Sequence, residues 1–130
     1  MKLENIKFKA KRIDNKKWVY GSLIRSTTGI KERAYIVDNF SSMSDYSVIG
    51  VDPSTVCQFT GLKDYEGNEI WEGDLLTYRY FKDIYEVAWG EDDACFKIVN
   101  TRYRERTEPL GYSIRNIAWC VVGNKFDNDK

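Results

Sequence analysis

The sequence predicts a single, mainly β domain, an antiparallel barrel or half-barrel with little helix, for which an SH3-like small barrel is one possible form. Three observations predict this class. Short segments alternate apolar and polar residues or are rich in β-branched and aromatic residues. Glycine and Asn/Asp turns separate these segments at intervals of about 8–12 residues. No stretch shows the apolar periodicity of a helix, and 130 residues with 42% hydrophobic content suffice for one core.

The N-terminal part, residues 1–51, is expected to open with a β-hairpin. Residues 6–11 alternate apolar and basic side chains, which predicts a strand with one buried face and a row of lysines in water. Residues 14–17 supply the turn, and residues 18–24 the second strand. Two further short strands and a serine-rich loop between them are predicted at 34–37, 48–51 and 38–47.

The second part, residues 52–126, begins at Asp52-Pro53, a helix start that the β-branched Thr55 and Val56 limit to one turn. The strands expected after it cover 55–62, 69–71, 75–80, 85–89, 94–99 and 117–122, with turns at 63–68 and 72–74. The arginine-rich stretch 100–116 lacks a clear apolar face, so we expect an exposed loop there.

The net charge is zero, but the charges are unevenly distributed. Residues 1–36 hold ten basic and three acidic residues (+7), residues 37–93 hold three basic and thirteen acidic residues (−10), and residues 94–130 hold seven basic and four acidic residues (+3). This pattern fits a mixed solvated surface, pairing between subunits, or a basic face for nucleic acid. The zero net charge and a pI of about 6.3 weaken the third interpretation, because nucleic-acid-binding domains are usually basic.

Several classes of chemistry are disfavoured by composition. The chain has no histidine, which removes the commonest general base and metal ligand. Cys57, Cys95 and Cys120 are odd in number, widely spaced and set in apolar segments, so we predict free thiols. No apolar run approaches the length of a membrane span, and no apolar leader is present, which predicts a cytoplasmic protein without membrane contact. We expect no enzyme activity, no cofactor and no bound metal.

Several segments together resemble the YopX family, small proteins carried by bacteriophages and prophages. The core of the resemblance is Val56 to Asp64, then Gly67, then Glu69 to Leu75. Supporting segments are Lys7 to Ala10, Trp18 to Gly21, Val51 with Pro53, Val122 to Asn124, and Asp127-Asn128. Departures from the family pattern occur at Cys57, Trp71 and Phe126. The resemblance implies a mainly β fold and a phage setting in the bacterial cytoplasm, and it implies no settled activity.

The acidic segment within this motif could bind Mg²⁺ or Ca²⁺ or serve in acid/base chemistry. It contains Asp64, Glu66, Glu69, Glu72 and Asp74. An EF-hand loop needs glycine at its sixth position, whereas Gly67 stands fourth after Asp64. We therefore favour turn chemistry, in which the carboxylates bond nearby backbone N–H groups.

Two groups of residues are candidates for interaction. Gln58 and Thr60 share one face of a predicted strand, where they could bind a ligand or satisfy neighbouring backbone groups. The arginines of the predicted loop could contact phosphate or an acidic partner; they are Arg102, Arg104, Arg106 and Arg115. Glu105 and Glu108 among them weaken the positive field. The many aromatic residues are assigned to the core rather than to stacking platforms.

The function expected from these observations is that of a non-enzymatic phage or prophage accessory protein. It would act as a homo-oligomeric interaction module with a host or phage protein as partner. The alternative is a nucleic-acid-binding module that uses the basic N-terminal hairpin and residues 102–115. A metal-dependent hydrolase that uses Asp64, Glu69, Glu72 and Asp74 is a weaker third hypothesis.

Overall fold

The computed structural model describes residues 1–27, 29, 31–38 and 47–127. Half of these residues lie in strands and 11% in helices, so the predicted mainly β fold is confirmed. The chain divides into two compact units, residues 1–59 and 60–130, and the division falls inside strand β5 (Cys57–Lys63). No helix among the described residues is long and apolar enough to cross a membrane.

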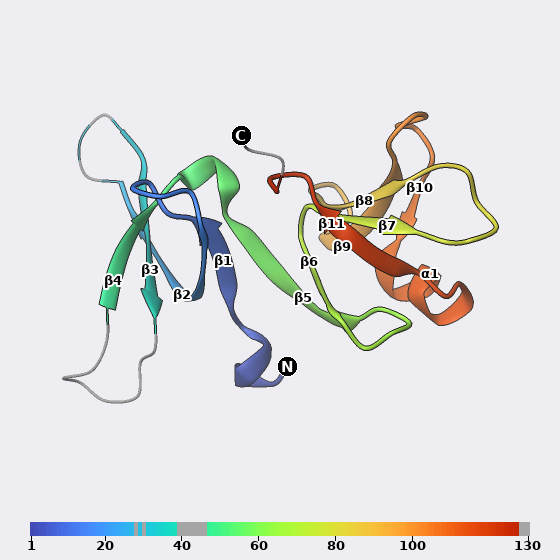
Figure 1. Ribbon diagram of the computed structural model, residues 1–130, viewed down its shortest axis with the longest axis horizontal. Coiled ribbons are helices and arrows are strands. Elements are labelled where there is room, and N and C mark those ends of the chain that lie inside the picture. The colour runs from blue at the N-terminus through green and yellow to red at the C-terminus, as the bar shows by residue number, and fades with distance from the viewer. Residues whose placement is uncertain (28, 30, 39–46, 128–130) are drawn as a thin grey trace. The chain divides into compact units, whose positions relative to one another are not determined.

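The first unit is an antiparallel sheet in the order β4-β3-β2-β1-β5 (Figure 1). Its elements are the 3₁₀ turn η1 (Leu3–Asn5), β1 (Phe8–Lys11), β2 (Trp18–Ser26), β3 (Arg33–Asp38), β4 (Ser47–Val51), the 3₁₀ turn η2 (Pro53–Thr55) and the start of β5. The predicted hairpin is confirmed, since β1 pairs with β2 from Phe8 opposite Gly21 to Lys11 opposite Trp18. The predicted loop at 38–47 lies outside the described residues, apart from its two ends.

The sheet of the first unit curls so that the residues at the end of β1 and just after it meet the end of β4. Arg12 and Val51 form an isolated antiparallel bridge. Beside it, the N–H of Ile13 donates to the Gly50 carbonyl at 3.2 Å, and the N–H of Asp52 donates to the Lys11 carbonyl at 2.9 Å. The closure stops there, so the described residues form two antiparallel sheets and no closed barrel.

The lysines of β1 correct one prediction. Lys9 and Lys11 are only 7% and 9% exposed, so the expected row of lysines in water is wrong for both. Pairing with β2 places Trp18 opposite Lys11 on the same face. The ammonium groups of Lys9 and Lys11 lie 4.4 and 4.9 Å from the centre of the Trp18 ring. Cation–π attraction and burial of the lysine stems account for the difference.

The opposite face of the sheet carries the core of the first unit: Ala10, Val19, Ala34, Ile36 and Val51. Gly21 lies within this packing, where β2 runs against β3. A Cβ added to Gly21 would lie 2.0 Å from the carbonyl oxygen of Val37, a contact that only a shift of the backbone could relieve.

Gly21→Ala is therefore expected to lower the free energy of unfolding by about 3 kcal/mol, at the upper end of the range for overpacking. The matched control is Gly50→Ala, because a Cβ there would meet only the Cδ1 atom of Ile13 at 3.8 Å, an ordinary contact. Urea denaturation of the two variants checks this prediction. Equal stability of the two would show that the β2–β3 contact tolerates a side chain.

The second unit is a five-stranded antiparallel sheet in the order β10-β9-β8-β7-β11, together with a hairpin of the end of β5 and β6. Its elements are β6 (Glu69–Trp71), β7 (Asp74–Thr77), β8 (Tyr85–Gly90), β9 (Cys95–Asn100), β10 (Thr107–Pro109), α1 (Leu110–Asn116) and β11 (Cys120–Asn124). Its core consists of Ile70, Leu76, Val87, Ile98, Leu110 and Trp119. All three cysteines are free thiols.

The predicted exposed loop at 100–116 is wrong in its second half. Residues 107–109 form β10, which pairs with β9, and residues 110–116 form α1. Leu110 and Ser113 of this helix are buried, and Ser113 Oγ accepts a hydrogen bond of 2.8 Å from Trp119 Nε1. A helix of seven residues is too short to show periodicity in the sequence, so tertiary packing determines it.

Candidate functional site

Asp64 occupies the turn between β5 and β6 and is 7% exposed. Its Oδ1 atom accepts hydrogen bonds from the N–H groups of Glu66 and Asn68 at 2.9 and 2.8 Å. Its Oδ2 atom accepts from the Val121 N–H at 2.9 Å and from Asn68 Nδ2 at 3.2 Å. The carboxylate thus holds its own turn and ties that turn to β11, and we call this arrangement the Asp64 clamp.

The electrostatics of the Asp64 clamp favour the charged carboxylate. Burial raises the pKa of Asp64, but the hydrogen bonds from Val121, Asn68 and Glu66 together outweigh it, so the pKa lies below its ordinary value. A carboxylate has about four acceptor positions, and four donors already occupy those of Asp64. The clamp therefore leaves this group little capacity to ligate a metal or accept a proton.

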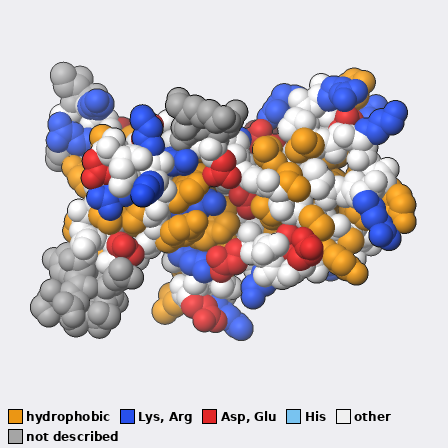
Figure 2. All heavy atoms as spheres, in the orientation of Figure 1, with side chains coloured by type: hydrophobic (Ala, Val, Ile, Leu, Met, Phe, Trp, Pro, Cys, Tyr) orange, Lys and Arg blue, Asp and Glu red, His pale blue; other side chains and the backbone are white. Residues whose placement is uncertain are grey.

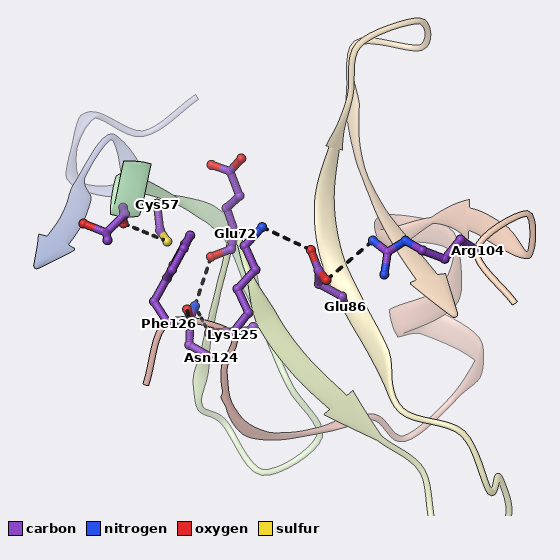
Figure 3. A network of polar contacts seen from close by, with 9 residues as sticks. Cys57, Glu72, Glu86, Arg104, Asn124, Lys125 and Phe126 are labelled. Carbon is purple, nitrogen blue, oxygen red and sulfur yellow. Dashed lines mark hydrogen bonds and ion pairs between the residues drawn. The ribbon is translucent and has the colours of Figure 1, made fainter. Parts of the chain in front are cut away.

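A second clamp joins the β6–β7 turn to the end of β11. The buried Asp74 accepts a hydrogen bond of 2.7 Å from the Trp71 N–H through Oδ2, and one of 2.9 Å from Asn124 Nδ2 through Oδ1. The same Nδ2 donates to the Glu72 carbonyl at 3.1 Å (Figure 3). Asn124 Oδ1 accepts from the Phe126 N–H at 3.0 Å. We call this arrangement the Asn124 clamp.

These contacts support the turn interpretation of Asp64 and Asp74. Within the part of the chain that the structure describes, no three Cys, Asp or Glu side chains are grouped closely enough to hold a metal ion. The metal-dependent hydrolase hypothesis therefore has no assembled ligand set among those residues.

Gln58 and Thr60 differ in the contacts that the structure shows for them. Thr60 Oγ1 donates to the Ile70 carbonyl at 2.7 Å and accepts from the Leu62 N–H at 3.1 Å, so this hydroxyl satisfies backbone groups of the β5–β6 hairpin. Gln58 is half-buried and pairs with Phe8 in the sheet of the first unit.

The four candidate arginines make different contacts. Arg102 forms an ion pair with Asp83 at 3.3 Å, and Arg104 forms one with Glu86 at 3.6 Å. Figure 3 shows Glu86 between Arg104 and Lys125, whose ammonium group lies 3.4 Å away. The Arg106 guanidinium lies 4.6 Å from the centre of the Tyr103 ring. Arg115 is exposed in the last turn of α1.

Sequence reasoning missed a cavity of about 390 Å³ in the second unit, which we call the aromatic pocket. Its apolar wall consists of Phe81, Tyr85, Ile98, Ile117 and Trp119, and its polar rim consists of residues 105–108. The ring centre of Trp119 lies 5.6 Å from that of Phe81 and 5.1 Å from that of Tyr85. Phe81 is 43% exposed, and hydrophobic side chains reach the surface in both units (Figure 2).

The rim of the aromatic pocket is held in place by the buried Asn100. Its Oδ1 atom accepts from the N–H groups of Arg102 and Tyr103, both at 2.8 Å, and its Nδ2 atom donates to Asp83 at 3.0 Å. Thr101 Oγ1 donates to the Ile84 carbonyl at 2.7 Å. The segment before the rim is thus bonded to the segment that carries Phe81, so two of the segments that line the pocket are linked.

The fold and these contacts define a small, mainly β protein in which acidic turn residues brace the second unit beside an aromatic pocket. The chain matches the family model of the YopX protein over residues 7–130, nearly its whole length, and it belongs to the YopX family. No curated protein matches it.

Some of the residues on which the family resemblance rests belong to the two clamps. Asp64 is the acceptor of the first clamp, Asp74 and Asn124 belong to the second, and Gly67 and Gly73 lie in the same two turns. Gly67 and Gly73 have φ angles of 88° and 86°, in the region that favours glycine. These motif residues therefore have structural roles in the turns, and those roles explain why carboxylates, an amide and glycines stand at these positions.

Proposed function

We propose that the chain is a non-enzymatic accessory protein of a phage or prophage that binds another protein in the bacterial cytoplasm through its aromatic pocket. The observation that carries this proposal is a pocket lined by Phe81, Tyr85 and Trp119, in which the segment that carries Phe81 is bonded through Asp83 to Asn100. The volume of the aromatic pocket, about 390 Å³, lies at the lower end of the range for ligand sites. A pocket of this size suits one or two side chains of a docking segment.

The composition of the pocket supports protein recognition. Aromatic residues surrounded by a polar rim are the common arrangement of interaction hot spots. Here the rim offers both signs of charge, through Glu105, Arg106 and Glu108. The motif carboxylates Asp64 and Asp74 are meanwhile engaged with backbone and amide groups.

The nucleic-acid alternative has less support. Arg102 and Arg104 are ion-paired with carboxylates of the same unit, and a phosphate would have to displace these. Lys9 and Lys11 of the N-terminal hairpin are buried. Titration of a polyanion at several salt concentrations tests this alternative, because phosphate binding weakens steeply as salt rises.

The proposal predicts that Phe81→Ala abolishes capture of a partner by the tagged chain from host lysate. The matched control is Tyr112→Ala, which removes an exposed ring from α1 outside the pocket and is expected to capture the same protein as the wild type. Thermal melting verifies that both variants fold. Equal capture by the two variants, or capture that nucleases abolish, would contradict the proposal.

A further inference from the structure

The N-terminal segment, residues 1–7, presents apolar side chains to solvent on an ordered turn. Met1, Leu3 and Ile6 are 101%, 83% and 44% exposed, and no residue of the 3₁₀ turn Leu3–Asn5 is buried. A short 3₁₀ turn has poor internal hydrogen-bond geometry and gains no packing here. Leu3 is therefore an apolar side chain that is accessible to a second molecule.

The aromatic pocket and the N-terminal segment are complementary. The pocket offers aromatic and aliphatic walls with the charged side chains of Glu105, Arg106 and Glu108 at its rim, two carboxylates to one guanidinium. In the described residues neither carboxylate forms an ion pair within 4.0 Å. The segment offers Leu3, with the exposed charged residues Lys2 and Glu4 on either side of it in the sequence. An apolar side chain next to an ammonium group fits an apolar pocket with a partly acidic rim.

We propose that the aromatic pocket of one copy binds the N-terminal segment of a second copy, with Leu3 against the rings and Lys2 at the rim carboxylates. This inference rests on the proposed function, because it uses the same pocket as a docking site. Each copy carries one segment and one pocket, so two copies can exchange segments in a symmetric dimer, and successive copies can bind head to tail in a ring or an open chain.

Exposed ion pairs add little stability, so burial of Leu3 supplies most of the affinity and the charges set the register. Assembly is therefore expected to persist in high salt.

The test uses two complementary variants of the full chain. Leu3→Glu disables the segment, and Phe81→Glu places a charge in the wall of the pocket. Tyr112→Glu is the matched control, since Tyr112 is exposed on α1 outside both surfaces. The molar mass at micromolar concentration is measured by multi-angle light scattering.

The wild type and Tyr112→Glu are expected to assemble in both low and high salt, whereas Leu3→Glu and Phe81→Glu are each expected to be monomeric. An equimolar mixture of the two monomeric variants is expected to form a two-chain complex, because each supplies the surface that the other lacks. Should Phe81→Glu fail to fold, the rim variant Glu105→Lys/Glu108→Lys replaces it, with weakened assembly as the expected result.

A monomeric wild type, assembly by Leu3→Glu, or a mixture that stays monomeric would overturn the inference. If the wild type is monomeric while partner capture still depends on Phe81, the second-copy contact fails and the proposed function stands. If Phe81→Ala changes neither assembly nor capture, both fail.

Discussion

Replacing Asp64 with asparagine is expected to lower the free energy of unfolding at pH 7 by about 4 kcal/mol. The buried carboxylate accepts four hydrogen bonds, and bonds to charged groups contribute about 1.5–3 kcal/mol each. Asparagine keeps one acceptor oxygen and turns an NH₂ group toward donors. Either the Val121 N–H or the turn N–H groups then lose their partner.

Urea denaturation followed by tryptophan fluorescence checks this prediction. The matched control is Asp92→Asn in the exposed β8–β9 turn, where we expect a change within about 0.5 kcal/mol. Similar stabilities of the two variants would show that the Asp64 clamp contributes no more to the free energy of unfolding than an exposed aspartate does.

The pH dependence of this difference follows from the lowered pKa of Asp64. A carboxyl group whose folded-state pKa is depressed contributes stability above its unfolded pKa, about 3.9, and loses it as pH falls through the folded pKa. The stability gap between the wild type and Asp64→Asn is therefore expected to be full at pH 7 and to close as the pH falls below about 4.

Asn124→Asp is expected to destabilise the chain by about 4 kcal/mol at pH 8. The new carboxylate would replace an amide that donates to Asp74 Oδ1 at 2.9 Å and to the Glu72 carbonyl at 3.1 Å. Two carboxylates at this distance cannot both ionise cheaply, and the pair retains a proton with a raised pKa. Because the protonated pair can restore one hydrogen bond, stability is expected to rise as the pH falls from 8 to 5.

The control for this variant is Asn116→Asp, which changes an exposed amide that donates only to the Tyr112 carbonyl. We expect a change within about 1 kcal/mol and no trend between pH 5 and pH 8. Thermal melting across this pH range compares the two variants. A loss of stability in Asn124→Asp that does not vary with pH would contradict the carboxylate contact with Asp74.

The sequence predicts much of this fold because its signals are local. Period-two alternation and glycine turns marked the hairpin of β1 and β2 and most later strands. The burial of Lys9 and Lys11 was not predictable, because it depends on which residues of β2 lie opposite them. The helix α1 was missed for a related reason, since Leu110 and Ser113 become recognisable only against the core that they contact.

The candidate site shows the same limit. Turn chemistry for Asp64 and Asp74 was predicted from adjacent glycines, and their hydrogen bonds agree with it. The partners Val121 and Asn124 are 57 and 50 residues away along the chain, so no local pattern could have indicated them. Phe81 and Trp119 were assigned to the core by composition, and only their placement beside the rim reveals the aromatic pocket.

Asp64 is a charged acceptor for the backbone of β11. An NMR pH titration of the wild-type chain, which follows the Asp64 carboxyl carbon and the backbone amides, tests this role. We expect Asp64 to titrate below its ordinary pKa and the amide protons of Val121, Asn68 and Glu66 to shift with the same midpoint. Titration of Asp64 at or above its ordinary pKa, or a Val121 amide that does not follow it, would show that the carboxylate does not serve this backbone.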